Sequence, residues 1–244
     1  GGIVTDSIMK NIYDKHLKNW FKKNYKFLLT ILIYILFQSN FLFSILYSLG
    51  INLSILPNIC KRILLYLNDT IYVVIVIFMY KKEIKEGIYD LKKNFSNRAS
   101  LSVKCWIFGC VLMVVSSIII NHFLNQNASI NEQIIRNNIK KAPIYMIFTC
   151  SFVAPILEEM TFRRSLYGLI KNKWIFIISS GVIFGLLHVI GSYNNIFDFL
   201  YIIPYGAMGS CFAFLLTKTN NITLPIIIHV LHNTILVMNQ IFRG

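Results

Sequence analysis

Residues 155–164, with the sequence PILEEMTFRR, place two adjacent glutamates and two adjacent arginines inside a run that otherwise has the composition of a membrane-spanning helix. The apolar run begins near Pro143 and resumes at residues 165–170, SLYGLI. Both carboxylates are therefore expected to lie well below the bilayer surface. A charge at the centre of a spanning helix costs at least about 2.5 kcal/mol, so such groups usually face a partner or a wet cavity and mark functional sites.

The spacing of these charges predicts different environments for the two glutamates. On an α-helix Glu159 and Arg163 are four residues apart and share one face, where they can form an ion pair. Glu158 points about 100° away and needs another partner or a proton. Pro155 removes one helix hydrogen bond and is expected to bend the span beside a cavity. The alternative is that the two glutamates end a helix at the cytoplasmic surface.

The whole chain has the composition of an integral membrane protein. Of its 244 residues 56% are hydrophobic, which is far more than a soluble domain of this length needs. About seven apolar stretches are long enough to approach the thickness of a bilayer. They cover residues 27–49, 63–80, 103–123, 143–170, 174–191, 196–217 and 224–242. The predicted fold is an all-α polytopic membrane helix bundle, with short amphipathic interfacial helices at 8–26 and 129–141 and a basic loop at 81–104.

The basic residues set the expected orientation. The formal net charge of +14 indicates the positive-inside bias of a multi-pass protein and affinity for anionic lipids, since no nucleic-acid motif is present. With the N-terminus inside, most of the 24 Lys and Arg residues fall in cytoplasmic segments. The exceptions are Lys61, Arg62, Arg136, Lys140, Lys141 and Arg243. We expect a bacterial cell membrane protein with a cytoplasmic N-terminus; its oligomeric state is not predicted.

Three segments are expected along the chain. Residues 1–26 form a basic juxtamembrane segment, whose Gly1-Gly2 start without methionine is interpreted as a cloning remnant. Residues 27–128 hold spans one to three, and residues 129–244 hold spans four to seven with all the motifs that suggest chemistry. The five cysteines are an odd number without CxxC spacing, so they predict no disulfide framework.

Polar residues recur in spans five and seven. His188 follows Gly181 and Gly185, a glycine pair that lets a second helix approach closely. At a rise of about 1.5 Å per residue, His188 and His229 fall near the middle of the membrane, as Glu158 does. A glutamate at lipid depth can serve as a general base, and His188 can share its proton. His229 and Asn233 lie four residues apart and can aim donors at one oxyanion. These residue types together predict hydrolysis of a peptide bond.

Other interpretations of the same polar residues stay open. Glu158, His188 and His229 could supply three ligands to a zinc ion with an open fourth position, although no HExxH motif is present. Asp69 in span two has no second motif around it, and His232 fits a helix-interface residue. A non-catalytic scaffold or immunity protein is an alternative function. A proton-coupled transporter is disfavoured because no inverted repeat is visible.

Three motifs taken together resemble those of one family. They are EEMTFR at 158–163, FGLLH at 184–188 and HVLHN at 229–233. This arrangement resembles the CPBP family, which comprises CAAX prenyl endopeptidases and bacteriocin-processing or self-immunity proteins, and it covers about residues 129–240. The resemblance implies an all-helical intramembrane endopeptidase. It assigns water activation to Glu158 and His188, oxyanion binding to His229 and Asn233, and support of the glutamate pair to Arg163, with Glu159 and Phe184 as further supporting residues.

The resemblance also implies the kind of substrate. A small hydrophobic or amphipathic peptide is expected, such as the precursor of a peptide pheromone or bacteriocin; a CAAX-like membrane-associated protein is the other possibility. The expected partners are this substrate and anionic lipid. No cofactor is expected, and zinc is the alternative because glutamate-type and metal-type mechanisms both fit such a site.

Overall fold

The computed structural model describes residues 2–243, with side chains from residue 13 onward, and all of its regular elements are helical. Gly1, the first residue of the expected cloning remnant, and Gly244 lie outside the described part. The α-helices are α1 (Gly2–Gln38), α2 (Phe41–Ser48), α3 (Asn58–Met79), α4 (Lys81–Lys93), α5 (Phe95–Leu124), α6 (Ile130–Lys141), α7 (Pro143–Phe148), α8 (Ala154–Glu158), α9 (Leu166–Leu169), α10 (Lys173–Val189), α11 (Ile202–Thr219) and α12 (Thr223–Arg243). The shorter elements are the 3₁₀-helices η1 (Leu53–Ile55) and η4 (Ile196–Tyr201) and the π-helices η2 (Thr149–Val153) and η3 (Glu159–Ser165).

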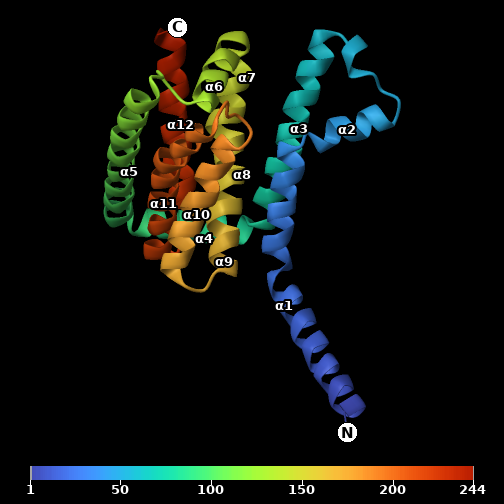
Figure 1. The fold of residues 1–244 in the computed structure, drawn as a ribbon. Helices are drawn as coiled ribbons and strands as arrows, with labels where there is room; N and C mark the ends of the chain where they lie inside the picture. Colours follow the sequence, from blue (N-terminus) through green and yellow to red (C-terminus); the bar gives the residue numbers. More distant parts are fainter. Residues whose placement is uncertain (1, 244) are drawn as a thin grey trace.

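The glutamate-bearing span lies at the centre of the fold. It runs from α7 through α8 to α9, with α10, α11, α12 and α5 on one side and α1 and α3 on the other (Figure 1). The main hydrophobic core joins the span to α1, α3, α10 and α11, and Tyr34, Val76, Leu157, Phe176 and Leu216 are among its buried members. Helix α5 packs on α11 through a smaller cluster that includes Cys105 and Leu215. Because the span contacts both sides, its polar residues are shielded from lipid by the neighbouring helices.

The predicted polytopic helix bundle is confirmed, although fewer helices than predicted meet the requirements for a full span. Five helical stretches are long and apolar enough to cross a membrane, and the bent pair α1 and α2 would make a sixth. They are α3, α5, α7 to α9 taken together, η4 with α11, and α12. The predicted fifth span corresponds to α10, which has 17 residues and is shorter than the roughly 20 that a bilayer requires.

Three helix boundaries differ from those expected. The basic segment at 8–26 is helical as predicted, but it is not a separate element, because α1 continues without a break from Gly2 to Gln38. The first predicted span is broken after Gln38, where Asn40 adopts a left-handed conformation and α2 turns by 64°. Residues 81–104 are helical rather than a loop. In each case tertiary packing or a single turn residue decides the helix boundary, which hydropathy alone does not report.

Helix α4 lies across the end of the bundle at which α9 ends (Figure 1). Its Asp90 accepts hydrogen bonds from Nε of Arg98 at 2.7 Å and from the side-chain amide of Asn221 at 2.9 Å. The Arg98 guanidinium and these amide donors lower the pKa of Asp90 to about 2, so the carboxylate stays ionised at neutral pH. The contacts tie α4 to the turn between α11 and α12.

Helices α10 and α11 pack with their backbones close together. A Cβ atom added at Gly185 would lie 2.6 Å from the carbonyl oxygen of Ile202, and one added at Gly206 would lie 3.1 Å from that of Gly181. The close approach predicted from the glycine pair is therefore confirmed. The close packing of α10 against α11 matters for the site because Phe184 and His188 lie on α10.

Replacement of Gly185 by alanine is expected to destabilise the protein by about 1–3 kcal/mol, since the new methyl group meets backbone that cannot move independently. The thermal unfolding midpoint in detergent measures the effect. Gly191→Ala is the matched control, because a Cβ there meets no atom within 4 Å. Equal midpoints for the two variants would contradict the explanation.

Candidate active site

The span that carries the glutamates is not a regular α-helix. The π-helical stretches η2 and η3 flank α8, and Pro155, which lacks an N–H group, lies between them. A π-turn shifts the hydrogen-bond register and is frequent at functional sites. Side-chain donors reach three carbonyl oxygens of the span: Asn233 bonds to Cys150, Ser165 to Met160 and Ser180 to Phe162. The distorted backbone is therefore held by its neighbours, including a candidate catalytic residue.

Glu159 lies between a cation and an imidazole. Its Oε2 is 3.1 Å from Nε of Arg163, and both side chains are 0% exposed, so the ion pair predicted from their spacing is present. Its Oε1 is 2.7 Å from Nδ1 of His229 on α12, and accepts the ring N–H. Glu159 thus fixes the orientation of His229, a role that the sequence did not indicate because the two residues lie on different helices.

His229 also faces the second glutamate. Its Nε2 is 3.6 Å from Oε2 of Glu158, so the ring stands between the two carboxylates with one nitrogen toward each. Because Nδ1–H is donated to Glu159, Nε2 is the nitrogen available for proton exchange with Glu158 or with a water molecule beside it.

Arg163 is enclosed by aromatic rings. Its guanidinium carbon lies 4.5 Å from the centroid of the Phe184 ring and 5.6 Å from that of Phe212. The faces of these rings attract a cation, and the exclusion of water strengthens the ion pair with Glu159. Phe184 also packs 4.3 Å from the ring of His188, centroid to centroid, so the motif phenylalanine contacts two predicted site residues.

His188 is held by its own helix and by α11. Its Nδ1–H donates to the carbonyl oxygen of Phe184 at 2.8 Å, which leaves Nε2 free. Its ring stacks on Tyr205 with centroids 4.7 Å apart and planes at 25°. The hydroxyl of Tyr205 in turn lies 2.8 Å from Oγ of Ser129 and 3.3 Å from Nδ2 of Asn131 at the start of α6. Tyr205 was missed by the sequence analysis, since no motif marks it.

The remaining polar candidates have different surroundings. The Asn233 amide donates one hydrogen to the carbonyl oxygen of Cys150 at 2.9 Å and keeps a second N–H. Nδ1 of His232 accepts the indole N–H of Trp106 at 3.2 Å, as suits a helix-interface histidine. Asp69 accepts from the hydroxyl of Tyr145 at 2.8 Å and is not part of the cavity wall.

The four predicted catalytic side chains line one cavity. Glu158, His188, His229 and Asn233 all contribute to a space of about 450 Å³ that extends toward α6. Its volume is in the range of small-ligand sites. The structure therefore brings together residues from the fourth, fifth and seventh predicted spans. Hydropathy alone could place these residues only at a similar depth in the membrane.

The suggested zinc ligands were compared with the geometry that a metal requires. Each has a free donor atom, and a His₂Glu set is chemically suited to zinc. Among the side chains that the structure describes, those of residues 13–243, no group of three or more His, Cys, Asp or Glu is close enough to hold a metal ion. In this arrangement the three suggested ligands do not form a metal-binding cluster.

The motifs and the site lie in the part of the chain that is similar to known proteins. Residues 140–235 match the family described as type II CAAX prenyl endopeptidase Rce1-like. This matched region carries the three motifs that resemble those of the CPBP family. It includes all seven predicted catalytic and supporting residues, Glu158, Glu159, Arg163, Phe184, His188, His229 and Asn233.

Curated proteins similar to this part of the chain are bacterial. YdiL of Bacillus subtilis, whose name describes a candidate membrane peptidase, is 38% identical over 114 residues, which is 46% of this chain and 43% of YdiL. The membrane-embedded CAAX protease MroQ of Staphylococcus aureus is 34% identical over 140 residues, which is 54% of this chain and 53% of MroQ. The chain spans about half the length of the curated relatives it matches. No solved structure matches it.

Proposed function

We propose that the protein is an intramembrane endopeptidase that hydrolyses a bond in a small hydrophobic or amphipathic peptide or in a membrane-associated protein. One observation supports this most directly. Glu158, His188, His229 and Asn233 line a single cavity, and His229 bridges the two glutamates at 3.6 and 2.7 Å. A carboxylate, two imidazoles and an amide around one cavity are the groups that acyl transfer to water needs.

In the proposed reaction Glu158 takes a proton from water while the water oxygen bonds to the scissile carbonyl carbon. The free Nε2 of His188 orients that water. The second N–H of Asn233 and a protonated Nε2 of His229 stabilise the oxyanion, and Glu158 is the neighbour that can supply the proton to His229. As the oxyanion collapses, the C–N bond breaks, and the proton that Glu158 took from water passes to the leaving amine. Glu159 and Arg163 keep the His229 ring in place.

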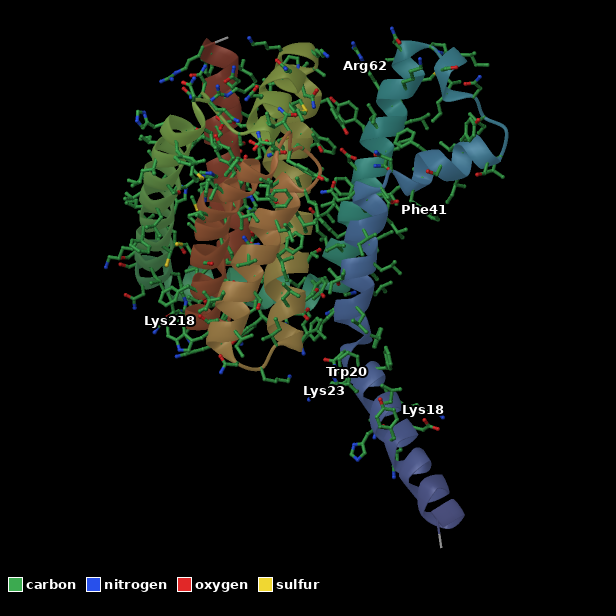
Figure 2. The ribbon with its side chains drawn as sticks, viewed as in Figure 1. Lys18, Trp20, Lys23, Phe41, Arg62 and Lys218 are labelled. Atoms are coloured by element: carbon green, nitrogen blue, oxygen red, sulfur yellow. The ribbon has the colours of Figure 1, made fainter. Side chains whose placement is uncertain are left out.

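The proposed location is a bacterial cell membrane with a cytoplasmic N-terminus. Lys18, Trp20 and Lys23 lie on the part of α1 that extends beyond the bundle (Figure 2). Trp20 is 47% exposed, and Lys18 and Lys23 are exposed as well. Aromatic and basic side chains together suit the interface of an anionic leaflet, so anionic lipid is the proposed partner of this segment.

Purified protein incubated with precursor peptides of pheromones and bacteriocins, followed by mass spectrometry, tests the proposal. A metal chelator is added in a parallel arm. New termini produced by the wild type but not by Glu158→Gln, with or without chelator, support the glutamate-type mechanism. Loss of cleavage on chelation, with recovery on addition of zinc, would instead favour the zinc-dependent version. Biological protection that persists without Glu158 would favour the scaffold or immunity alternative.

Replacement of Tyr205 by leucine is expected to lower the cleavage rate by about 10- to 10²-fold, because His188 loses the ring that orients it. Tyr205→Phe keeps the stacking and should retain most activity. The pH dependence of kcat distinguishes orientation from simple instability. We expect the profile of Tyr205→Leu to change shape, whereas partial unfolding would lower all its points equally. An unchanged profile in Tyr205→Leu would contradict the assigned role.

A further inference from the structure

The catalytic cavity occupies one end of the bundle rather than its full length. Its α5 lining lies at residues 113–118, in the second half of that helix, and its α12 lining lies at residues 229–240, toward the C-terminus. The α10 contribution, Phe184 and His188, comes from the last part of that helix. These segments all run toward the end at which α6 and the C-terminus lie (Figure 1).

Buried side chains separate the catalytic cavity from the opposite end, where a second space of about 330 Å³ lies beside α4 and is lined by none of the catalytic residues. Phe176, Phe212 and Leu215 are 0% exposed, as are Glu159 and Arg163. These side chains occupy the interior between the catalytic residues and the end where α4 crosses the bundle. A peptide could not pass through this packed region without displacing the ion pair that supports His229.

The wall of the cavity combines polar and apolar side chains and reaches exposed residues of α6 and α12. Asn131 of α6 and Gln240 of α12 offer amide groups there, each able to donate and to accept hydrogen bonds. Glu132 and Arg136 form an ion pair on α6 whose side chains are 46% and 45% exposed. The α5 wall adds the apolar residue Ile118. Amides beside an apolar wall suit an extended peptide. Its backbone needs hydrogen-bond donors and acceptors, and its apolar side chains can contact the wall.

The two ends of the bundle differ in their number of basic residues. Lys218 lies at the α4 end of the bundle, and Arg62 lies at the opposite end (Figure 2). Lys18 and Lys23 lie on the part of α1 that extends beyond the bundle on the α4 side. Most of the chain's 24 Lys and Arg residues belong to the segments at the α4 end. Because cytoplasmic loops are enriched in these residues, the α4 end is the cytoplasmic one. The cavity mouth is then at the outer face.

We infer that the substrate peptide enters the cavity from the outer face of the membrane, between α6 and the end of α12. The inference rests on the proposed endopeptidase function and adds the side from which the substrate comes. It also places the reaction in a sequence, since a substrate made inside the cell must have its scissile segment transported across the membrane before cleavage.

Vesicles of known orientation test the inference. A peptide that the detergent-solubilised protein cleaves is coupled to a hydrophilic dye that prevents membrane passage. Right-side-out vesicles should cleave it, sealed inside-out vesicles should not, and detergent should restore cleavage in the latter. Cleavage confined to inside-out vesicles would overturn the inference. If the solubilised protein cleaves no candidate peptide, the proposed function fails, and the thiol labelling below decides the direction independently.

Thiol labelling measures the direction without any activity. Asn239→Cys lies at the mouth and Lys218→Cys lies at the α4 end, and both positions are exposed. A membrane-impermeant maleimide should label Asn239→Cys in right-side-out vesicles and Lys218→Cys in inside-out vesicles, each above the baseline of the five native cysteines. The reverse pattern would overturn the inference even if no peptide substrate is found.

Discussion

Replacement of Glu158 by glutamine is expected to lower the cleavage rate by about 10²- to 10⁴-fold, the usual contribution of a general acid or base. Glutamine keeps the size of the side chain and can still form hydrogen bonds, but it cannot take a proton from water. Glu158 is the carboxylate that lines the cavity, with its side chain 10% exposed, whereas Glu159 is 0% exposed and bound to two partners. The measurement is kcat/KM for a peptide substrate.

A surface carboxylate provides the matched control for this substitution. Glu86 of α4 has a side chain that is 65% exposed, so Glu86→Gln should cleave at the wild-type rate. Circular dichroism and the thermal midpoint of Glu158→Gln should stay close to those of the wild type, since its nearest ionic partner is 3.6 Å away. Cleavage by Glu158→Gln at the wild-type rate would disprove the assigned role.

Replacement of Arg163 by methionine is expected to destabilise the protein by about 3–5 kcal/mol, because it leaves the carboxylate of Glu159 buried without its cation. The thermal midpoint in detergent should fall strongly. The double variant Arg163→Met/Glu159→Gln should recover much of the stability, since no uncompensated charge remains. It should not recover activity, because Nδ1 of His229 loses the carboxylate that orients it.

An exposed ion pair provides the control for the effect of burial on the stability contribution of the Glu159–Arg163 pair. Lys82 and Glu86 on α4 lie 3.9 Å apart with side chains 83% and 65% exposed. Lys82→Met should therefore change stability by less than about 1 kcal/mol. If Arg163→Met were as stable as Lys82→Met, or if the double variant were no more stable than Arg163→Met, the buried pair would not have the role assigned to it.

The sequence by itself determined the class of the protein and the chemistry available to it. Apolar runs of bilayer length are local signals, so the approximate positions of the apolar helices followed from hydropathy, although several of their boundaries did not. Charges inside those runs marked Glu158 and Glu159 as functional candidates. The pairing of Glu159 with Arg163 followed from helical spacing. The amphipathic helix at 129–141 was predicted in the same way.

Tertiary structure alone decided which polar groups meet. His229 is 70 residues from Glu159 in the chain, and Tyr205 is 76 from Ser129, so no local spacing encodes these contacts. Helix rotation is set by close packing at glycines such as Gly185, and the π-helical register of residues 159–165 depends on donors from neighbouring helices. Periodicity defines one helix at a time, whereas a catalytic site inside a bundle depends on how several helices are rotated against one another.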